Sequence, residues 1–293
     1  MPEFFNVLPP AQALKVLLDR LEPRPVSPAM DVPITEALGR VTAQVTHATE
    51  DLPSFPRSTM DGYSLRAADT FGASEGTPAY FTIAGDVPMG KPAGVSVGTG
   101  NAALAYTGGM LARGADAVIM VENTQQVDAT TIEVIRPVAH GENVVQPGED
   151  VKRGEVILPA GHYLRPQDLG GLTAMGITAV SVAAKPRVAI LSLGDEVVAP
   201  EATPSEGQIR DINTYTISAL VEQAGGVPLP LGIVKDNYEE QTGAAMRGLD
   251  MADVLVISAG SSVSSRDMTA QIIDNLGQPG VLVHGLAIRP GKP

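Results

Sequence analysis

The stretch VAILSLGDE, residues 188–196, is a continuous apolar run that passes directly into a glycine and two acidic residues. Similar apolar runs follow at residues 227–234, 254–258 and 281–288. Between them, apolar residues recur at helical spacing, at residues 217–224, 242–249 and 268–276. Short strands that alternate with helices predict a parallel sheet with helices on both faces, so we expect an α/β domain over residues 184–293.

Charged residues gather in the loops that follow these predicted strands. The acids are Asp195, Glu196, Asp236 and Asp267, and the cations are Lys235, Arg266, Arg289 and Lys292. Open α/β sheets bind ligands at the carboxyl ends of their strands, so we expect these side chains to line one cleft. Converging carboxylates repel each other unless a hard cation lies between them, and Mg²⁺ prefers oxygen ligands. The Gly-Ser loop at residues 260–266 suits a phosphate, and the pattern favours a Mg²⁺-assisted phosphoryl or phosphoanhydride site.

Each of these motifs also fits a structural role. The acids at residues 195–196 fit a solvated turn, residues 235–236 fit a surface turn, and Asp267 fits the N-cap of the next helix. The loop at residues 260–266 lacks the Gly-Lys-Ser/Thr ending of a Walker A loop. The residues alone therefore predict a ligand-binding α/β domain and leave metal and phosphate binding as one interpretation of its loops.

The preceding part of the chain has a different pattern. Strand-like runs alternate with glycine-rich turns at residues 80–83, 117–121 and 131–138. They predict a β-rich module over residues 46–144. Helical spacing lies on either side of it, at residues 14–21 and 166–175. We expect residues 1–45 and 145–183 to form one helical and extended linking domain into which the β-rich module is inserted.

The composition sets limits on function. The 293 residues, 44% of them hydrophobic, suffice for about two domains with their own cores. The formal net charge of −13 argues against binding to nucleic acid or to an anionic membrane surface. The chain has no cysteine, which excludes a thiolate nucleophile and a Cys-ligated metal site. It has no basic leader and no apolar run near the ~20 residues that span a bilayer, so we expect a cytoplasmic protein.

Taken in order along the chain, the motifs resemble those of the molybdopterin molybdenumtransferase family, which is related to the E-domain of gephyrin. The matching stretches are STMDGY at 58–63, YTGG at 106–109, GADAV at 114–118, PGED at 147–150, LGDE at 193–196, DIN at 211–213, VKD at 234–236, residues 258–267 and PGKP at 290–293. Each stretch is weak alone, but their ordered conjunction covers nearly the whole chain. The family continues past PGKP with further sheet and helix and a small β-barrel, so the chain resembles a C-terminally truncated member.

The resemblance implies a fold and a reaction. It implies a multidomain protein whose C-terminal parallel-sheet α/β domain binds molybdopterin. Members of the family insert molybdate into adenylylated molybdopterin, which gives molybdenum cofactor and AMP, with assistance from Mg²⁺. Molybdenum is then a substrate, and its ligands are the sulfur atoms of the pterin, which explains how a chain without cysteine handles this metal.

The resemblance also implies site residues. Glu196, Asp236 and Asp267 match the acids of the family's cleft and are the candidates for catalysis and for binding Mg²⁺. Asp61 and Thr107 match a pair of residues that the family's β-rich module supplies across a dimer interface, and Asp61 is a further candidate for catalysis. The implied substrate-binding residues are Thr107, Asp150, Gly260, Ser261, Arg289, Pro290, Lys292 and Pro293.

The implied partners are adenylylated molybdopterin, molybdate, a second copy of the chain in a homodimer, molybdopterin adenylyltransferase and apo-molybdoenzymes, with no nucleic acid and no membrane. Three alternatives stay open. A non-catalytic molybdopterin-binding or scaffolding protein would keep the architecture but has no need for clustered carboxylates. Molybdopterin adenylyltransferase lacks the module that carries residues 60–63, and a general nucleotide hydrolase would turn over ATP without a pterin.

Overall fold

The computed structural model describes residues 7–21, 28–259 and 263–288, with the backbone alone at residues 263–267. The chain divides into two compact units. The first, named the α/β unit, consists of Met1–Ala43, Tyr163–Arg165 and Ala179–Pro293. The second, named the β-sheet unit, consists of Gln44–His162 and Pro166–Thr178. Neither unit is one continuous stretch of sequence.

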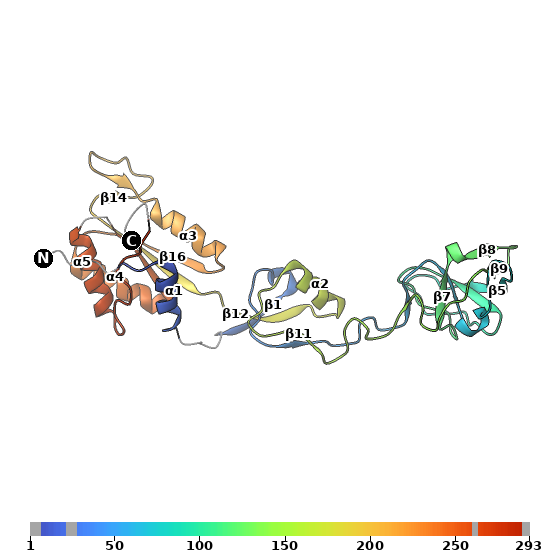
Figure 1. The fold of residues 1–293 in the computed structure, drawn as a ribbon. Coiled ribbons are helices and arrows are strands. Elements are labelled where there is room, and N and C mark those ends of the chain that lie inside the picture. Colours follow the sequence, from blue (N-terminus) through green and yellow to red (C-terminus); the bar gives the residue numbers. More distant parts are fainter. Residues whose placement is uncertain (1–6, 22–27, 260–262, 289–293) are drawn as a thin grey trace. The chain divides into compact units, whose positions relative to one another are not determined.

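The α/β unit is built on a parallel sheet of order β16-β13-β17 (Figure 1). Its strands are β13 (Arg187–Leu193), β16 (Val227–Val234) and β17 (Val254–Ser258). The helices that alternate with them are α3 (Asn213–Gln223), α4 (Tyr238–Met251) and α5 (Val263–Asn275). The alternation of strand and helix that the apolar periodicity predicts is confirmed, and the sheet is parallel.

Alternate residues of the central strand β13 face opposite sides of the sheet. Leu191 and Leu193 pack with Ala244 of α4 and Ile272 of α5 in one buried cluster. Ser192 lies between the two leucines and therefore points to the other face. Helix α3 packs against β13 and β16, and Figure 1 shows it on the side of the sheet opposite α4 and α5. The one polar residue of this buried stretch is thus directed toward α3.

Shorter elements complete the α/β unit. They are α1 (Pro10–Leu18), β1 (Ala29–Pro33), the 3-10 helix η1 (Ile34–Glu36), β12 (Ala179–Ala183), β14 (Val197–Val198) and β15 (Ile209–Arg210). Strand β1 pairs antiparallel with β12, and β14 pairs parallel with β15. The Ile209 N–H donates to the Glu196 carbonyl oxygen at 2.8 Å, so the chain after Glu196 returns to the start of α3.

The strand predicted at residues 281–288 is wrong. In the described chain this segment forms an isolated bridge, between Leu286 and Leu8, in place of a strand. The Val281 N–H donates to Asp274 Oδ1 at 2.9 Å, and Gly285 has a φ of 91°, which interrupts extended backbone. An apolar run predicts burial, but a strand also needs a neighbouring strand along its length.

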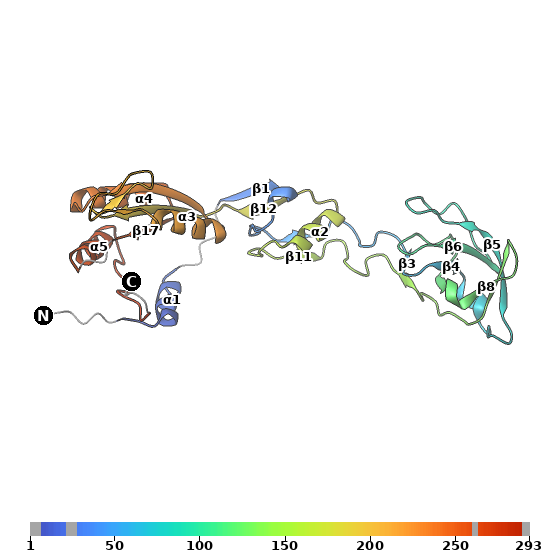
Figure 2. The ribbon, with the colours of Figure 1, turned by 90° about the horizontal axis from the view of Figure 1, so that it is seen from above.

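The β-sheet unit contains a mixed sheet of order β7-β4-β6-β5-β9-β8 (Figure 2). Its strands are β4 (Gly62–Leu65), β5 (Ala79–Asp86), β6 (Asn101–Ala105), β7 (Ala117–Met120), β8 (Thr124–Gln126) and β9 (Thr131–Val134). Phe81, Ile119 and Ile132 are central to its buried core. The region is β-rich, as its strand-like runs predict.

Other elements of the β-sheet unit lie outside this sheet. They are β2 (Thr46–His47), β3 (Arg57–Ser58), the 3-10 helices η2 (Ala67–Thr70) and η3 (Val121–Asn123), β10 (Val144–Val145), β11 (Val156–Leu158) and α2 (Pro166–Ala174). Strand β2 pairs with β11, and β3 pairs with β10. The two units divide the chain differently from the three expected domains, because α2 belongs to the β-sheet unit and β1 to the α/β unit. The three-domain division stays a prediction. No helix in the described ranges is both long and apolar enough to cross a bilayer.

Candidate active site

The loop after β13 is shaped by a glycine. Gly194 has a φ of 141°, and a Cβ there would lie 2.6 Å from Glu196 Oε2. The absence of a side chain at Gly194 therefore lets the Glu196 carboxylate fold back over the end of the strand. This carboxylate makes no hydrogen bond or ion pair with any described residue. It is available to a ligand.

The loop after β16 is tied to the loop after β13. Lys235 Nζ donates to the Asp195 carbonyl oxygen at 2.9 Å, and the Asp236 N–H donates to Asp195 Oδ1 at 3.3 Å. The buried Gln241 donates through Nε2 to Asp236 Oδ1 at 3.2 Å. The two loops are thus fixed side by side, as their positions after neighbouring parallel strands predict.

A cavity of about 240 Å³ lies at the carboxyl ends of β13 and β17. Its polar lining residues are Ser192, Glu196, Arg210, Asp211, Asn213 and Ser258, and its apolar lining residues are Leu193, Val197, Ile209, Ile212 and Ala259. Open α/β sheets bind ligands at this edge. Glu196 lines the cavity, whereas Asp236 lies in the adjacent loop and is not among the lining residues.

The start of α3 supplies one wall of the cavity. The buried Asp211, which precedes the N-cap residue Ile212, accepts two hydrogen bonds from Thr214 in the first turn of the helix, from N–H at 3.1 Å and from Oγ1 at 2.6 Å. Asn213 Nδ2 donates to Ser258 Oγ at 2.7 Å. This hydrogen bond joins the start of α3 to the last residue of β17, so the cavity wall is held from two elements.

The predicted pair in the β-sheet unit is in contact. Thr107 donates to Asp61 Oδ1 from its N–H at 2.8 Å and from Oγ1 at 3.0 Å. These hydrogen bonds hold the pKa of the exposed Asp61 carboxyl below its ordinary value of 3.8, and the bond from the Thr107 N–H has the larger effect. The next residue, Gly62, tolerates no side chain, because a Cβ there would lie 1.9 Å from the Ile119 carbonyl oxygen. Asp61 is therefore held as a charged, exposed carboxylate.

The predicted substrate residue Asp150 lies in the same unit. Its carboxylate pairs with the Arg57 guanidinium at 3.5 Å, and the side chains of Arg57 and Asp150 are 40% and 60% exposed. A pair of this length and exposure adds little stability. Arg57 precedes Ser58, whose N–H donates to the Gly109 carbonyl oxygen at 2.9 Å, close in sequence to Thr107.

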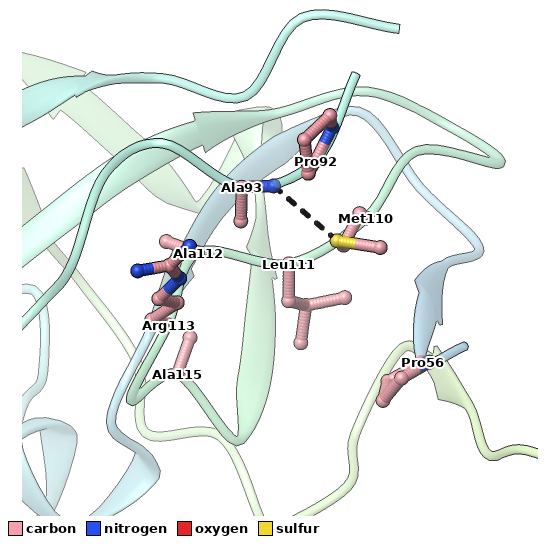
Figure 3. Close-up of a pocket in the computed structure, with 8 residues that line it drawn as sticks. All are labelled: Pro56, Pro92, Ala93, Met110, Leu111, Ala112, Arg113 and Ala115. Atoms are coloured by element: carbon pink, nitrogen blue, oxygen red, sulfur yellow. Dashed lines mark hydrogen bonds between the residues drawn. The ribbon is translucent and has the colours of Figure 1, made fainter. Parts of the chain in front are cut away.

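A second cavity, of about 300 Å³, lies in the β-sheet unit (Figure 3). It is lined by Pro56, Pro92, Ala93, Met110, Leu111, Ala112, Arg113 and Ala115. The hydrogen bond drawn there runs from the Ala93 N–H to Met110 Sδ at 3.4 Å. Apart from Arg113 its lining is uncharged, and it contains none of the predicted site residues.

Several predicted site residues lie outside the described part of the chain. They are Gly260, Ser261, Arg289, Pro290, Lys292 and Pro293, together with the side chain of Asp267. Among the side chains that are described, no group of three or more histidine and acidic residues could hold a metal ion. The predicted Mg²⁺ set includes Asp267, so it stays a prediction.

Sequence reasoning did not single out three residues of the first cavity. Ser192 had a signal, since it is the only polar residue in the run 188–193. Asn213 and Ser258 were part of matching motifs, but nothing in their spacing showed that they meet. Their contact depends on how α3 is placed against the sheet.

Comparisons with known proteins cover most of the chain. Residues 8–176 match the family described as the MoeA N-terminal region (domain I and II). Residues 189–293 match the family described as a probable molybdopterin binding domain. All residues that line the first cavity lie in the second match.

Individual relatives agree with these matches. A putative molybdopterin biosynthesis protein of Methanocaldococcus jannaschii is 36% identical over 98% of this chain and 72% of its own length. The molybdopterin molybdenumtransferases of a Nostoc species and of Haemophilus influenzae are each 33% identical over 89% of this chain, which spans 60% and 63% of their lengths. A crystal structure of the molybdopterin biosynthesis moeA protein from Pyrococcus horikoshii matches with a TM-score of 0.83 at 36% identity, over 98% of this chain and 71% of that chain.

Proposed function

The chain belongs to the MoeA family of molybdopterin biosynthesis proteins, and on this premise we propose that it is a molybdopterin molybdenumtransferase. In the proposed reaction molybdate is inserted into adenylylated molybdopterin, AMP is released and molybdenum cofactor is formed. Two relatives that carry this name are 33% identical to the chain, which spans about three fifths of their length.

The observation that carries the proposal is the cavity beside Glu196. It lies at the carboxyl ends of parallel strands, in the residues that match a probable molybdopterin binding domain. Its one carboxylate without a hydrogen-bond partner among the described residues is that of Glu196, and its other polar groups belong to neutral or already bonded side chains.

The acids of the strand ends have the chemistry that Mg²⁺ prefers. Glu196 and Asp236 follow neighbouring strands, and their loops are joined through Asp195. With Asp267 they would offer carboxylate oxygens to a hard cation. When bound there, Mg²⁺ would supply positive charge to the phosphoanhydride of the adenylylated substrate. Glu196 and Asp236 would hold that cation beside the phosphoanhydride, since carboxylates by themselves would repel it.

Asp61 and Thr107 are proposed to complete the site from the β-sheet unit of a second copy, in a homodimer. Their hydrogen bonds keep Asp61 exposed and charged. The remaining proposed substrate contacts are Asp150, Gly260, Ser261, Arg289, Pro290, Lys292 and Pro293. A separate linking domain, contacts with molybdopterin adenylyltransferase and apo-molybdoenzymes, and a cytoplasmic location belong to the same proposal.

The test is AMP release from adenylylated molybdopterin, measured with and without molybdate and Mg²⁺. Glu196→Gln should lower the rate about 100-fold, because it removes a charge from the proposed metal and substrate site. The matched control is Glu201→Gln, which changes the same charge on an exposed residue outside the cavity. AMP release that needs neither molybdate nor Mg²⁺, or equal rates in the two variants, would contradict the proposal. Binding of the substrate without AMP release would indicate a scaffold.

A further inference from the structure

The second cavity, of about 300 Å³, lies wholly within the β-sheet unit (Figure 3). Three of its lining residues are buried and form its floor, Ala93, Leu111 and Ala112. Three are exposed and form its rim, Pro56, Pro92 and Arg113. Its volume is at the lower end of the roughly 300–1,000 Å³ of sites that enclose a small organic ligand. The cavity is therefore large enough for a small molecule or for one residue of a polypeptide.

Hydrogen bonds hold the two segments that line this cavity against each other. The Arg113 N–H donates to the Val95 carbonyl oxygen at 3.1 Å, and the Val97 N–H donates to the Arg113 carbonyl oxygen at 2.8 Å. The Ala112 N–H donates to Oγ of the buried Ser64 at 3.2 Å. The cavity walls are thus fixed by the protein's own hydrogen bonds, and a ligand would not need to order them.

Arg113 supplies the charge of this cavity. It is the one charged residue among the described lining residues, and its guanidinium makes no hydrogen bond or ion pair with a described residue. In the same unit, by contrast, the Arg136 guanidinium pairs with Glu142 at 2.7 Å. A guanidinium without a protein partner attracts a carboxylate, which it can bind through two parallel hydrogen bonds.

The charge lies at one side of the cavity and apolar surface at the other. In Figure 3, Arg113 lies on one side of Leu111 and Pro56 lies on the other. The apolar lining residues offer surface that a ligand would remove from water, which favours an organic ligand over an inorganic anion. A ligand that fills the cavity would thus carry its negative charge at one end and an apolar body at the other.

The Ala93 N–H is a second donor at this cavity, and its acceptor is weak. It donates to Met110 Sδ at 3.4 Å, the hydrogen bond drawn in Figure 3. A thioether is a poor acceptor, and the unbranched side chain of Met110 adapts readily to a new neighbour. A carboxylate oxygen would be a stronger acceptor for this buried N–H.

We propose that this cavity binds a carboxylic acid with a short apolar body. Arg113 binds the carboxylate, the Ala93 N–H donates to an oxygen of the ligand, and the apolar body covers Leu111 and the two prolines of the rim. A free acid and the C-terminal residue of a polypeptide share this chemistry. The inference does not rest on the proposed reaction, because none of these residues lines the first cavity or is among the predicted site residues.

The test is an NMR titration of the full chain with phenylacetate, a carboxylate on an apolar ring. We expect a Kd of about 1 mM, the affinity of a small ligand of this size. Phenylacetamide keeps the ring and lacks the charge, whereas acetate keeps the charge and lacks the ring, and both should bind about tenfold more weakly. The amide proton of Ala93 should move downfield with phenylacetate, since a carboxylate oxygen replaces Met110 Sδ as its acceptor.

A peptide distinguishes the two sources of the ligand. The dipeptide N-acetylalanylphenylalanine carries the carboxylate and the ring at the end of a polypeptide. Tighter binding of this peptide than of phenylacetate would identify a polypeptide C-terminus as the occupant, and weaker binding would identify a free acid.

Variants of arginine locate the site. Arg113→Gln should weaken phenylacetate binding about tenfold, because it removes the charged donor. The matched control is Arg153→Gln, which removes the same charge from an exposed residue of the same unit, outside the cavity. Neither guanidinium bonds to a described residue, so the melting temperatures of both variants should equal that of the wild type.

Three results would overturn the inference. They are no binding of phenylacetate at millimolar concentration, equal affinities of the wild type for phenylacetate and phenylacetamide, and equal affinities of Arg113→Gln and Arg153→Gln for phenylacetate. The second result is independent of any variant, so it decides the matter even if Arg113→Gln fails to fold.

Discussion

The loops that carry Glu196 and Asp61 each contain a glycine that leaves no room for a side chain, but the two carboxylates differ in their hydrogen bonds. Each carboxylate lies within two residues of a glycine where a Cβ would collide with a neighbouring atom, at Gly194 and Gly62. Asp61 accepts two hydrogen bonds from Thr107, whereas Glu196 accepts none from a described residue. A carboxylate with its own protein donors is fixed in place, and one without them is free to bind a ligand. A glycine that leaves no room for a side chain therefore does not by itself show whether the neighbouring carboxylate is fixed by the protein or available to a ligand.

The largest effect on stability is expected at Gly62. Gly62→Ala would place a Cβ 1.9 Å from the Ile119 carbonyl oxygen, which belongs to the neighbouring strand and cannot move alone. We expect a loss of about 3 kcal/mol in the free energy of unfolding, measured in urea. Gly76→Ala is the control, since a Cβ there would meet nothing within 4 Å. Equal urea midpoints for the two variants would show that the strands at Gly62 separate easily.

A smaller loss in the free energy of unfolding is expected for Gly194→Ala. The atom that a Cβ would meet there is the end of the flexible Glu196 side chain, which can turn away, so the main cost is the φ of 141°. We expect about 1–2 kcal/mol in urea unfolding, together with slower AMP release because Glu196 is displaced. In a Glu196→Ala background the stability cost of Gly194→Ala should fall, since the collision is gone. If Gly194→Ala lowers the free energy of unfolding equally with Glu196 and with Ala at position 196, contact between the new Cβ and the Glu196 carboxylate does not contribute to the loss.

Asp211, just before α3, is a further carboxylate with its own hydrogen-bond donors, and its removal should lower the stability less than either glycine substitution. Asp211→Ala removes the acceptor of two hydrogen bonds from Thr214 and should lower the free energy of unfolding by about 1 kcal/mol. Asp211→Asn keeps one acceptor oxygen and should retain part of this stability. The melting temperatures of the two variants check this order, and equal values would show that the charge of Asp211, which both variants lack, matters more than its hydrogen bonds.

The smallest effect is the pH dependence of Asp61. Its pKa is lowered in the folded protein, so its contribution to stability is present above 3.8 and is lost as the pH falls through the lower folded value. The difference in melting temperature between wild type and Asp61→Asn should therefore be constant near neutral pH and shrink below about pH 4. Thr107→Val, which lacks the hydroxyl donor, should raise the pKa of Asp61, as carboxyl NMR titration can measure. A pKa unchanged by this substitution would leave the N–H bond as the sole cause.

Much of the fold follows from local pattern. The strands at 227–234 and 254–258 match β16 and β17 in their bounds, and the helices overlap the apolar stripes that predict them. The run at 281–288 has the same apolar character and forms no strand in the described chain. The difference lies in strand pairing: β16 and β17 each pair with β13 along their length, whereas segment 281–288 forms a single bridge with the described residues, between Leu286 and Leu8.

Some residues of the candidate site could likewise be predicted from the sequence, and others could not. Glu196 and Asp236 follow strands, and the register of a parallel sheet brings such residues to one edge, so their neighbourhood was predictable. Asp61 and Thr107 are 46 residues apart in sequence, and the resemblance alone paired them before the structure placed them in contact. Asn213 and Ser258 belong to motifs that carry the resemblance, but neither those motifs nor their spacing predicts that the two side chains are in contact.

The sequence by itself determined strands β13, β16 and β17, the helices that alternate with them and the sheet edge at which Glu196 and Asp236 lie, because periodicity and strand polarity are local properties. The tertiary structure alone decided which strand lies in the middle, which face Ser192 points to and which side chains close the cavity around it. Those depend on contacts between segments far apart in the chain, and the free energy of such contacts is set by packing that no single segment contains.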